Sequence, residues 1–66
     1  MVRKDVVMRA AARLYDYGEV EYEHAQALRT HVRYTSTRQG RVCFLNDAAS
    51  LLSTSRARLI SIINRL

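Results

Sequence analysis

Arginine is the side chain with the most evident chemistry in this sequence, and it is unevenly distributed. Residues 24–66 hold seven arginines and a single acid, Asp47, whereas residues 1–23 hold four basic side chains and five acids. The net charge is therefore +6 in the second part and −1 in the first. A guanidinium forms paired hydrogen bonds with phosphate or guanine, and a concentrated positive half is typical of a polyanion-binding protein. Charge alone leaves DNA, RNA and an acidic membrane surface open.

Catalytic and metal chemistry have no comparable support. The sequence has no glycine-rich phosphate loop and no plausible Ser/His/Asp set, and Glu19, Glu21 and Glu23 would spread around a helix rather than form an acid–base pair. His24 and His31 would lie two helical turns apart, about 10 Å, which is too far to share one metal ion. We interpret them as partly buried, hydrogen-bonded histidines, with pH sensing or metal binding as alternatives. We expect no enzyme activity, cofactor, metal or small-molecule ligand.

Length and composition predict one small domain over residues 1–66. A chain of this size buries only about 60% of its unfolded surface, so the core is small. Cys43 has no second cysteine to pair with, and we interpret it as a buried hydrophobe in a reducing compartment, with a reactive thiol as the alternative. No apolar run approaches the roughly 18 residues of a membrane span, and no signal peptide is evident. We expect a cytoplasmic protein with no membrane partner.

Two helices are expected in the first half of the chain. The first covers 1–17 and ends at Gly18, where a residue that tolerates positive φ is favoured. Its inward stripe is Val6, Ala10, Leu14 and Tyr17, with Val7 and Ala11 beside it. The second covers 19–33, with glutamates at its start and arginines at its end, as the helix dipole favours. Its inward stripe is Val20, His24, Ala27, Leu28, His31 and Val32.

In the second half of the chain, the residue pattern predicts two further helices, 46–52 and 55–66. Residues 34–40 have turn chemistry, and 41–45 form either one brief strand or an extended lead-in. Asn46 or Asp47 would cap the first of these helices, and Ser55 would cap the second. The inward stripe of the last helix is Leu59, Ile62, Ile63 and Leu66. The fold class expected is all-α, a small three- to four-helix bundle with room for one short strand before its last two helices.

A steep crossing of two helices through a tight turn needs a small residue at the crossing and a tolerant backbone in the turn. Ala49 and Ser53 supply them. Residues 46–66 resemble the helix-turn-helix of bacterial and phage regulators, most closely the short form of LacI-type repressors and excisionase-like proteins. The positions that match this pattern are Ala49, Leu51, Ser53, Thr54, Ser55, Leu59, Ile62 and Ile63. Ser53 stands where the family has glycine, and Thr54 where it has an apolar residue. An ordinary helical hairpin is the alternative.

The resemblance implies that the last helix enters the major groove of DNA by its N-terminal end. Ser55, Arg56 and Ala57 would face the groove first, with Ser61 one turn later. Arg56 would read guanine, because arginine can bond both of its acceptors, and Ala57 would touch a thymine methyl.

Other polar side chains would position the DNA backbone. The expected phosphate contacts are Ser55, Arg58 and Asn64, with Arg41 and Arg38 as weaker candidates. A solvated helix start is the alternative for Arg56 and Arg58, although the helix dipole disfavours cations there.

The function expected is sequence-specific binding of double-stranded DNA, by a small transcriptional regulator or a phage or plasmid DNA-binding factor that is nucleoid-associated when bound. Ile60 outside the apolar stripe and the tyrosines of the first half suggest a homodimer, because tyrosine is common at interfaces. The alternative is a protein-interaction module: an antitoxin, an anti-activator or a phage-encoded inhibitor of a host protein. Its interface would be the carboxylate-rich first half.

Overall fold

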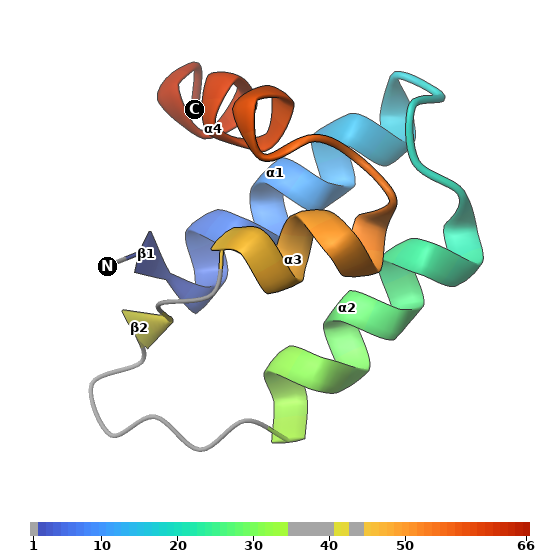
Figure 1. The fold of residues 1–66 in the computed structure, drawn as a ribbon, viewed down its shortest axis with the longest axis vertical. Coiled ribbons are helices and arrows are strands. Elements are labelled where there is room, and N and C mark those ends of the chain that lie inside the picture. Colours follow the sequence, from blue (N-terminus) through green and yellow to red (C-terminus); the bar gives the residue numbers. More distant parts are fainter. Residues whose placement is uncertain (1, 35–40, 43–44) are drawn as a thin grey trace.

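The computed structural model describes residues 2–34, 41–42 and 45–66, and over these residues it is a small all-α bundle (Figure 1). The helices are α1 (Lys4–Asp16), α2 (Tyr22–Tyr34), α3 (Leu45–Leu52) and α4 (Arg56–Asn64). Two short strands, β1 (Val2–Arg3) and β2 (Arg41–Val42), precede α1 and α3. The all-α fold class is therefore confirmed.

The core forms where the four helices meet. Helix α1 packs against both α2 and α4, and α3 packs against α2 and α4. In Figure 1, α4 lies along one end of the bundle and α2 runs away from it. The buried side chains are Val7, Ala10, Ala11, Leu14, Val20, Leu28, Val32, Ala48, Ala49, Leu52, Leu59 and Ile62. Burial of such apolar area is the main term holding α3 and α4 in place.

Helix α1 ends at a glycine, as expected. Gly18 has a φ of 77°, in the left-handed region that glycine adopts without a Cβ penalty. Its N–H donates to the carbonyl of Tyr15, and the N–H of Glu19 donates to that of Leu14, both at 2.9 Å. These two bonds form a Schellman motif, which satisfies the last carbonyls of a helix and stops it.

The start expected for the second helix was wrong by three residues. The N–H of Glu19 is bonded back to α1, and Val20, only 5% exposed, enters the core before any helix begins. Helix α2 therefore starts at Tyr22. Glu19 lies in the connecting turn instead of in a first helical turn, and this places its side chain where it can reach another helix.

Some residues expected to point inward are exposed. Tyr17 is 54% exposed because it is the C-cap residue of α1, where the chain turns away. On α2 the buried positions are Leu28 and Val32, so its inward face is narrow, and Ala27 and His31 lie outside it. The remaining expected inward residues of α1 and α2 are buried, except Val6 and His24, which are half-buried.

The start of α3 also differs from expectation. Residues 41–42 form a brief strand that pairs antiparallel with β1, in the register Val2 to Val42 and Arg3 to Arg41; β1 was not expected, because the first helix was placed from residue 1. Helix α3 begins at Leu45, so Asn46 and Asp47 lie in its first turn and do not cap it. A carboxylate in a first turn is still favoured by the helix dipole.

At the other end, α4 stops at Asn64, two residues earlier than expected, and Leu66 is 41% exposed. Cys43 lies outside the described residues. Over the part of the chain that is described, no helix is long and apolar enough to cross a membrane.

Candidate nucleic-acid interface

The connection between α3 and α4 is three residues long, 53–55, and is fixed by its backbone. Ser53 has a φ of 56°, the unusual conformation expected of it. Its N–H donates to the carbonyl of Ser50 at 3.1 Å, and the N–H of Thr54 donates to that of Ala49 at 2.9 Å. This is the same Schellman pattern that ends α1 at Gly18. Helix α3 therefore stops abruptly, although a serine occupies the position that favours glycine.

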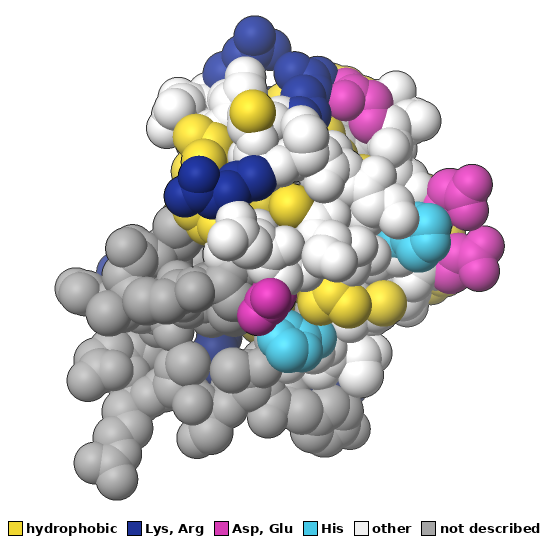
Figure 2. All heavy atoms as spheres, in the orientation of Figure 1, with side chains coloured by type: hydrophobic (Ala, Val, Ile, Leu, Met, Phe, Trp, Pro, Cys, Tyr) yellow, Lys and Arg dark blue, Asp and Glu magenta, His cyan; other side chains and the backbone are white. Residues whose placement is uncertain are grey.

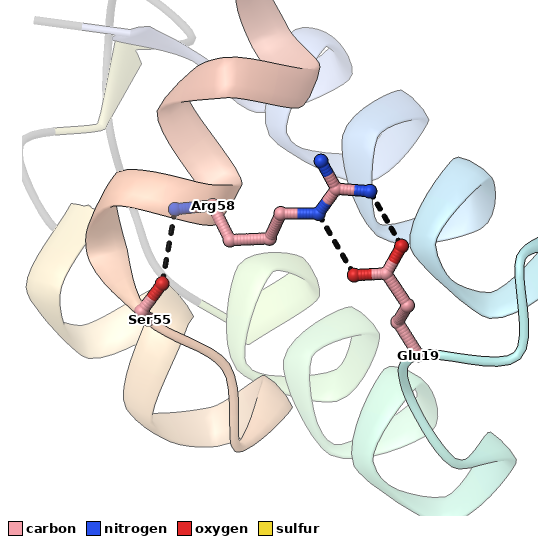
Figure 3. Close-up of polar contacts among 3 residues, drawn as sticks. All are labelled: Glu19, Ser55 and Arg58. Carbon is pink, nitrogen blue, oxygen red and sulfur yellow. Dashed lines mark hydrogen bonds and ion pairs between the residues drawn. The ribbon is translucent and has the colours of Figure 1, made fainter.

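Two residues set how α4 leaves this turn. Ala49 is only 4% exposed, so a small side chain faces the interior where α3 meets its neighbours. The Ser55 hydroxyl oxygen accepts a hydrogen bond of 3.0 Å from the backbone N–H of Arg58 (Figure 3). The expectation that Ser55 caps the last helix is therefore confirmed. A hydroxyl that accepts one bond can still donate its proton to another group.

Helix α4 has an inward and an outward face. Leu59 and Ile62 are buried, and each is at most 2% exposed. Ala57, Ser61 and Asn64 lie at i, i+4 and i+7, which places them on one stripe of the helix. Ala57 and Asn64 are exposed and Ser61 is half-buried. The structure thus brings three of the expected DNA-facing residues together on the outward face.

Arg56 opens α4 and is exposed. No ion pair or side-chain hydrogen bond joins Arg56 to another described residue. Its guanidinium is therefore accessible at the N-terminal end of the helix, on the side of α4 that also carries the half-buried Ile60 one turn later.

Arg58 is placed differently from Arg56. Its Nε donates to Oε1 of Glu19 at 2.8 Å, and its Nη2 donates to Oε2 at 2.5 Å, so the two side chains form a bidentate pair (Figure 3). The side chains are 32% and 36% exposed respectively. A phosphate contact by Arg58 through these same two donors would have to displace this carboxylate.

The pair shifts the titration of both groups. Hydrogen bonds from Arg58 hold the pKa of Glu19 below its ordinary value, with partial desolvation opposing the shift and the arginine charge adding to it. The same hydrogen bonds raise the pKa of Arg58. Glu19 is therefore a carboxylate, and Arg58 a cation, throughout the neutral range.

The remaining expected contacts are less defined. Arg41 lies in β2, directly before the segment that leads into α3, and its side chain is not among those described. Arg38 lies outside the described residues. Figure 2 shows Lys and Arg side chains on the part of the surface over α4, whereas acidic side chains gather where α2 begins.

A second surface feature lies between α1 and α2. It is an apolar groove of about 140 Å³, lined by Met8, Ala11, Ala12, Tyr15, Tyr22, Ala25, Gln26 and Arg29. The rings of Tyr15 and Tyr22 meet edge to face with their centroids 6.0 Å apart, although these residues are 45% and 62% exposed. Gln26 donates a 2.9 Å hydrogen bond to the Tyr22 hydroxyl. The sequence analysis suggested that tyrosines of the first half lie at a dimer interface, but it did not predict the groove.

Glu19 is the residue of this region that sequence reasoning missed. It lies 39 positions before Arg58, and no local pattern links the two. Within the described residues, no group of three or more His, Cys, Asp or Glu side chains could hold a metal ion.

Comparison with known proteins gives no relative: no family model matches the chain, and no curated protein or solved structure is significantly similar to it.

Proposed function

We propose that this chain binds duplex DNA by placing the N-terminal end of α4 in the major groove, as a small transcriptional regulator or a phage or plasmid DNA-binding factor. The observation that carries the proposal is the outward face of α4. It combines an accessible arginine at the helix start, Arg56, with a stripe of small and polar side chains. The core fixes the opposite face of the same helix, so the outward face is presented rigidly.

The side chains of this face suit a groove. Ala57 and Ser61 are short, so the helix could approach base edges closely, and Arg56 is long enough to reach the two acceptors of guanine. Ser55 keeps a hydroxyl proton that could be donated to a phosphate, and Asn64 is exposed at the far end of the stripe. Contacts of this second kind fix register without reading sequence.

The turn before α4 supports the same function. The left-handed Ser53 and the buried Ala49 produce a short, fixed connection between two helices. Such a connection lets one helix of a pair lie across the DNA backbone while the second enters the groove.

The test is a fluorescence-anisotropy titration of the protein against a random-sequence duplex at low and moderate salt. The variants are Arg56→Ala and, as a matched control, Arg33→Ala. Both arginines are exposed, but Arg33 lies in the last turn of α2, away from α4 in Figure 1. Each phosphate contact contributes about −0.9 to the slope of log K against log salt.

We expect wild-type binding with a steep salt slope, a loss of about five-fold or more for Arg56→Ala, and a much smaller loss for Arg33→Ala. Selection of a preferred duplex would follow, and Arg56→Ala should then relax the choice of base at one position. No binding, or equal losses for the two variants, would contradict a groove-reading α4.

The groove between α1 and α2 favours a second activity, association of two copies of this chain. Arg29 lines the groove, and the exposed acids Asp16 and Glu23 follow its two tyrosines in the sequence. In a two-fold dimer the same patch meets itself, so each Arg29 could face acidic side chains of the partner copy. Two copies would also present two α4 helices to successive half-sites of DNA.

Analytical ultracentrifugation over a range of micromolar concentrations tests this association. Tyr22→Ala should weaken it, whereas Tyr17→Ala should not, because Tyr17 is an exposed tyrosine that does not line the groove. A monomer at all concentrations would exclude the dimer and leave the groove to a different protein partner.

A further inference from the structure

The ion pair between Glu19 and Arg58 joins two parts of the molecule that are distant in the sequence. Arg58 lies in the first turn of α4, beside the proposed DNA-binding end. Glu19 belongs to the turn between α1 and α2, and its backbone is held there by the hydrogen bond from its N–H to Leu14. Figure 3 shows the Arg58 side chain extended from α4 toward this turn, with its guanidinium against the carboxylate.

A carboxylate and a phosphate bind to an arginine with the same geometry. Each accepts two parallel N–H bonds from one edge of the planar guanidinium. In this structure the Nε and Nη2 donors of Arg58 are both given to Glu19. A bidentate phosphate contact through the same edge is possible only when the carboxylate is released.

We propose that Glu19 is an intramolecular competitor of DNA phosphate for Arg58, and that it limits the DNA affinity of α4. This inference rests on the proposed DNA binding. Glu19 acts in two ways: it occupies the Nε/Nη2 edge of the guanidinium, and it places a negative charge close to the phosphates. The wild-type chain then binds DNA with one phosphate contact fewer than its arginines would allow.

The position of α4 does not depend on this pair. Leu59 and Ile62 anchor the helix in the core, and Ser55 caps it. Ion pairs between partly exposed side chains contribute little to stability, because water competes for both partners. Removing Glu19 should therefore release Arg58 without displacing α4, so that the effect on DNA is a gain and not a loss.

The experiment measures DNA affinity for Glu19→Gln at low and moderate salt. The matched control is Glu21→Gln, which removes the same charge from an exposed glutamate two residues away. A double-mutant cycle adds Arg58→Ala and Glu19→Gln/Arg58→Ala, which shows whether any gain requires Arg58. Circular dichroism of each variant checks that the helices are retained.

We expect Glu19→Gln to bind several-fold more tightly than wild type at low salt, with a salt slope steeper by about 0.9. Its advantage should then shrink about 3.5-fold between roughly 50 and 200 mM salt. Glu21→Gln should gain much less, and Glu19→Gln should gain little in the Arg58→Ala background.

Three results would overturn the inference: equal or weaker binding by Glu19→Gln, an equal gain from Glu21→Gln, or a gain that persists without Arg58. The last two would mean a general charge effect. If wild type binds and Arg56→Ala weakens it while Glu19→Gln changes nothing, only this inference fails. If no variant binds DNA, the proposed function fails with it.

Discussion

The turns that end α1 and α3 can be compared by opposite substitutions at their left-handed residues, Gly18 and Ser53. Helices α1 and α3 end with the same pair of backbone hydrogen bonds, yet Gly18 occupies the left-handed position in one and Ser53 in the other. A residue with a Cβ pays about 1–2 kcal/mol in that conformation. Glycine avoids this cost but loses about 0.4–1 kcal/mol through the greater freedom of its unfolded chain. We therefore expect Ser53→Gly to stabilise the protein by about 0.5–1 kcal/mol.

The reverse substitution, Gly18→Ser, should destabilise the protein by a similar amount. A Cβ built at Gly18 meets no atom within 4 Å, so backbone strain is the main term. Urea denaturation followed by far-UV circular dichroism measures both effects. With a slope of about 1 kcal/mol per molar urea, the midpoints should move by about 0.5–1 M in opposite directions. The double variant should unfold close to wild type, because the two turns are separate sites.

The reasoning would be refuted if Ser53→Gly left the midpoint unchanged or lowered it while Gly18→Ser lowered it. The Ser53 side chain would then contribute enough to offset the backbone strain. If neither substitution had an effect, the left-handed conformation would not carry the cost assigned to it. Either result would also weaken the use of this turn as support for the proposed DNA-binding unit.

Three further predictions concern the start of α4. Ser55→Ala removes the cap of α4 and should cost about 1 kcal/mol of unfolding free energy, measured in urea; no loss would mean that the hydrogen bond to Arg58 contributes nothing. Pairing lowers the pKa of Glu19 from its ordinary value of 4.5. The stability that the ion pair contributes is therefore fully present above pH 4.5, and it is lost as the pH falls through the lower pKa that Glu19 has in the folded protein. The stability difference between wild type and Glu19→Gln should therefore shrink in urea titrations below about pH 4.5, and a constant difference would exclude the pair as its cause. Arg56→Glu should raise the free energy of unfolding, measured in urea, by about a few tenths of a kcal/mol or more while weakening DNA binding; a loss of both stability and binding would indicate a structural role for Arg56.

Features set by neighbouring residues could be predicted from the sequence. Gly18 ends α1, Ser55 caps α4, and Ser53 adopts its unusual backbone, because each outcome depends on a residue's own conformational preference or on a partner within a few positions. The burial of Ala49 agrees with the expectation of a small residue where the two helices cross.

Features set by distant contacts could not be predicted. The start of α2 was misplaced because the acids at 19–23 suit a first helical turn, while the actual backbone of Glu19 is bonded back to α1. The pairing of Val2 with Val42 and of Glu19 with Arg58 joins positions about 40 residues apart. No periodicity or spacing in the sequence indicates either contact, because both depend on how the helices pack.

The two arginines at the start of α4 favour the hypothesis of an anionic ligand over that of a solvated helix start. The first turn of α4 contains no acidic residue, and the dipole of a helix disfavours cations at that end. The fold compensates Arg58 with the carboxylate of Glu19, but no described residue gives Arg56 an ion pair. A solvated helix start would be more stable with a neutral or acidic residue at this position. An exposed cation that opposes the dipole and has no acidic partner among the described residues favours the hypothesis of a ligand that brings its own negative charge. Under the proposed function, duplex DNA would supply that charge, and so Arg56 is the side chain on which the proposal depends most.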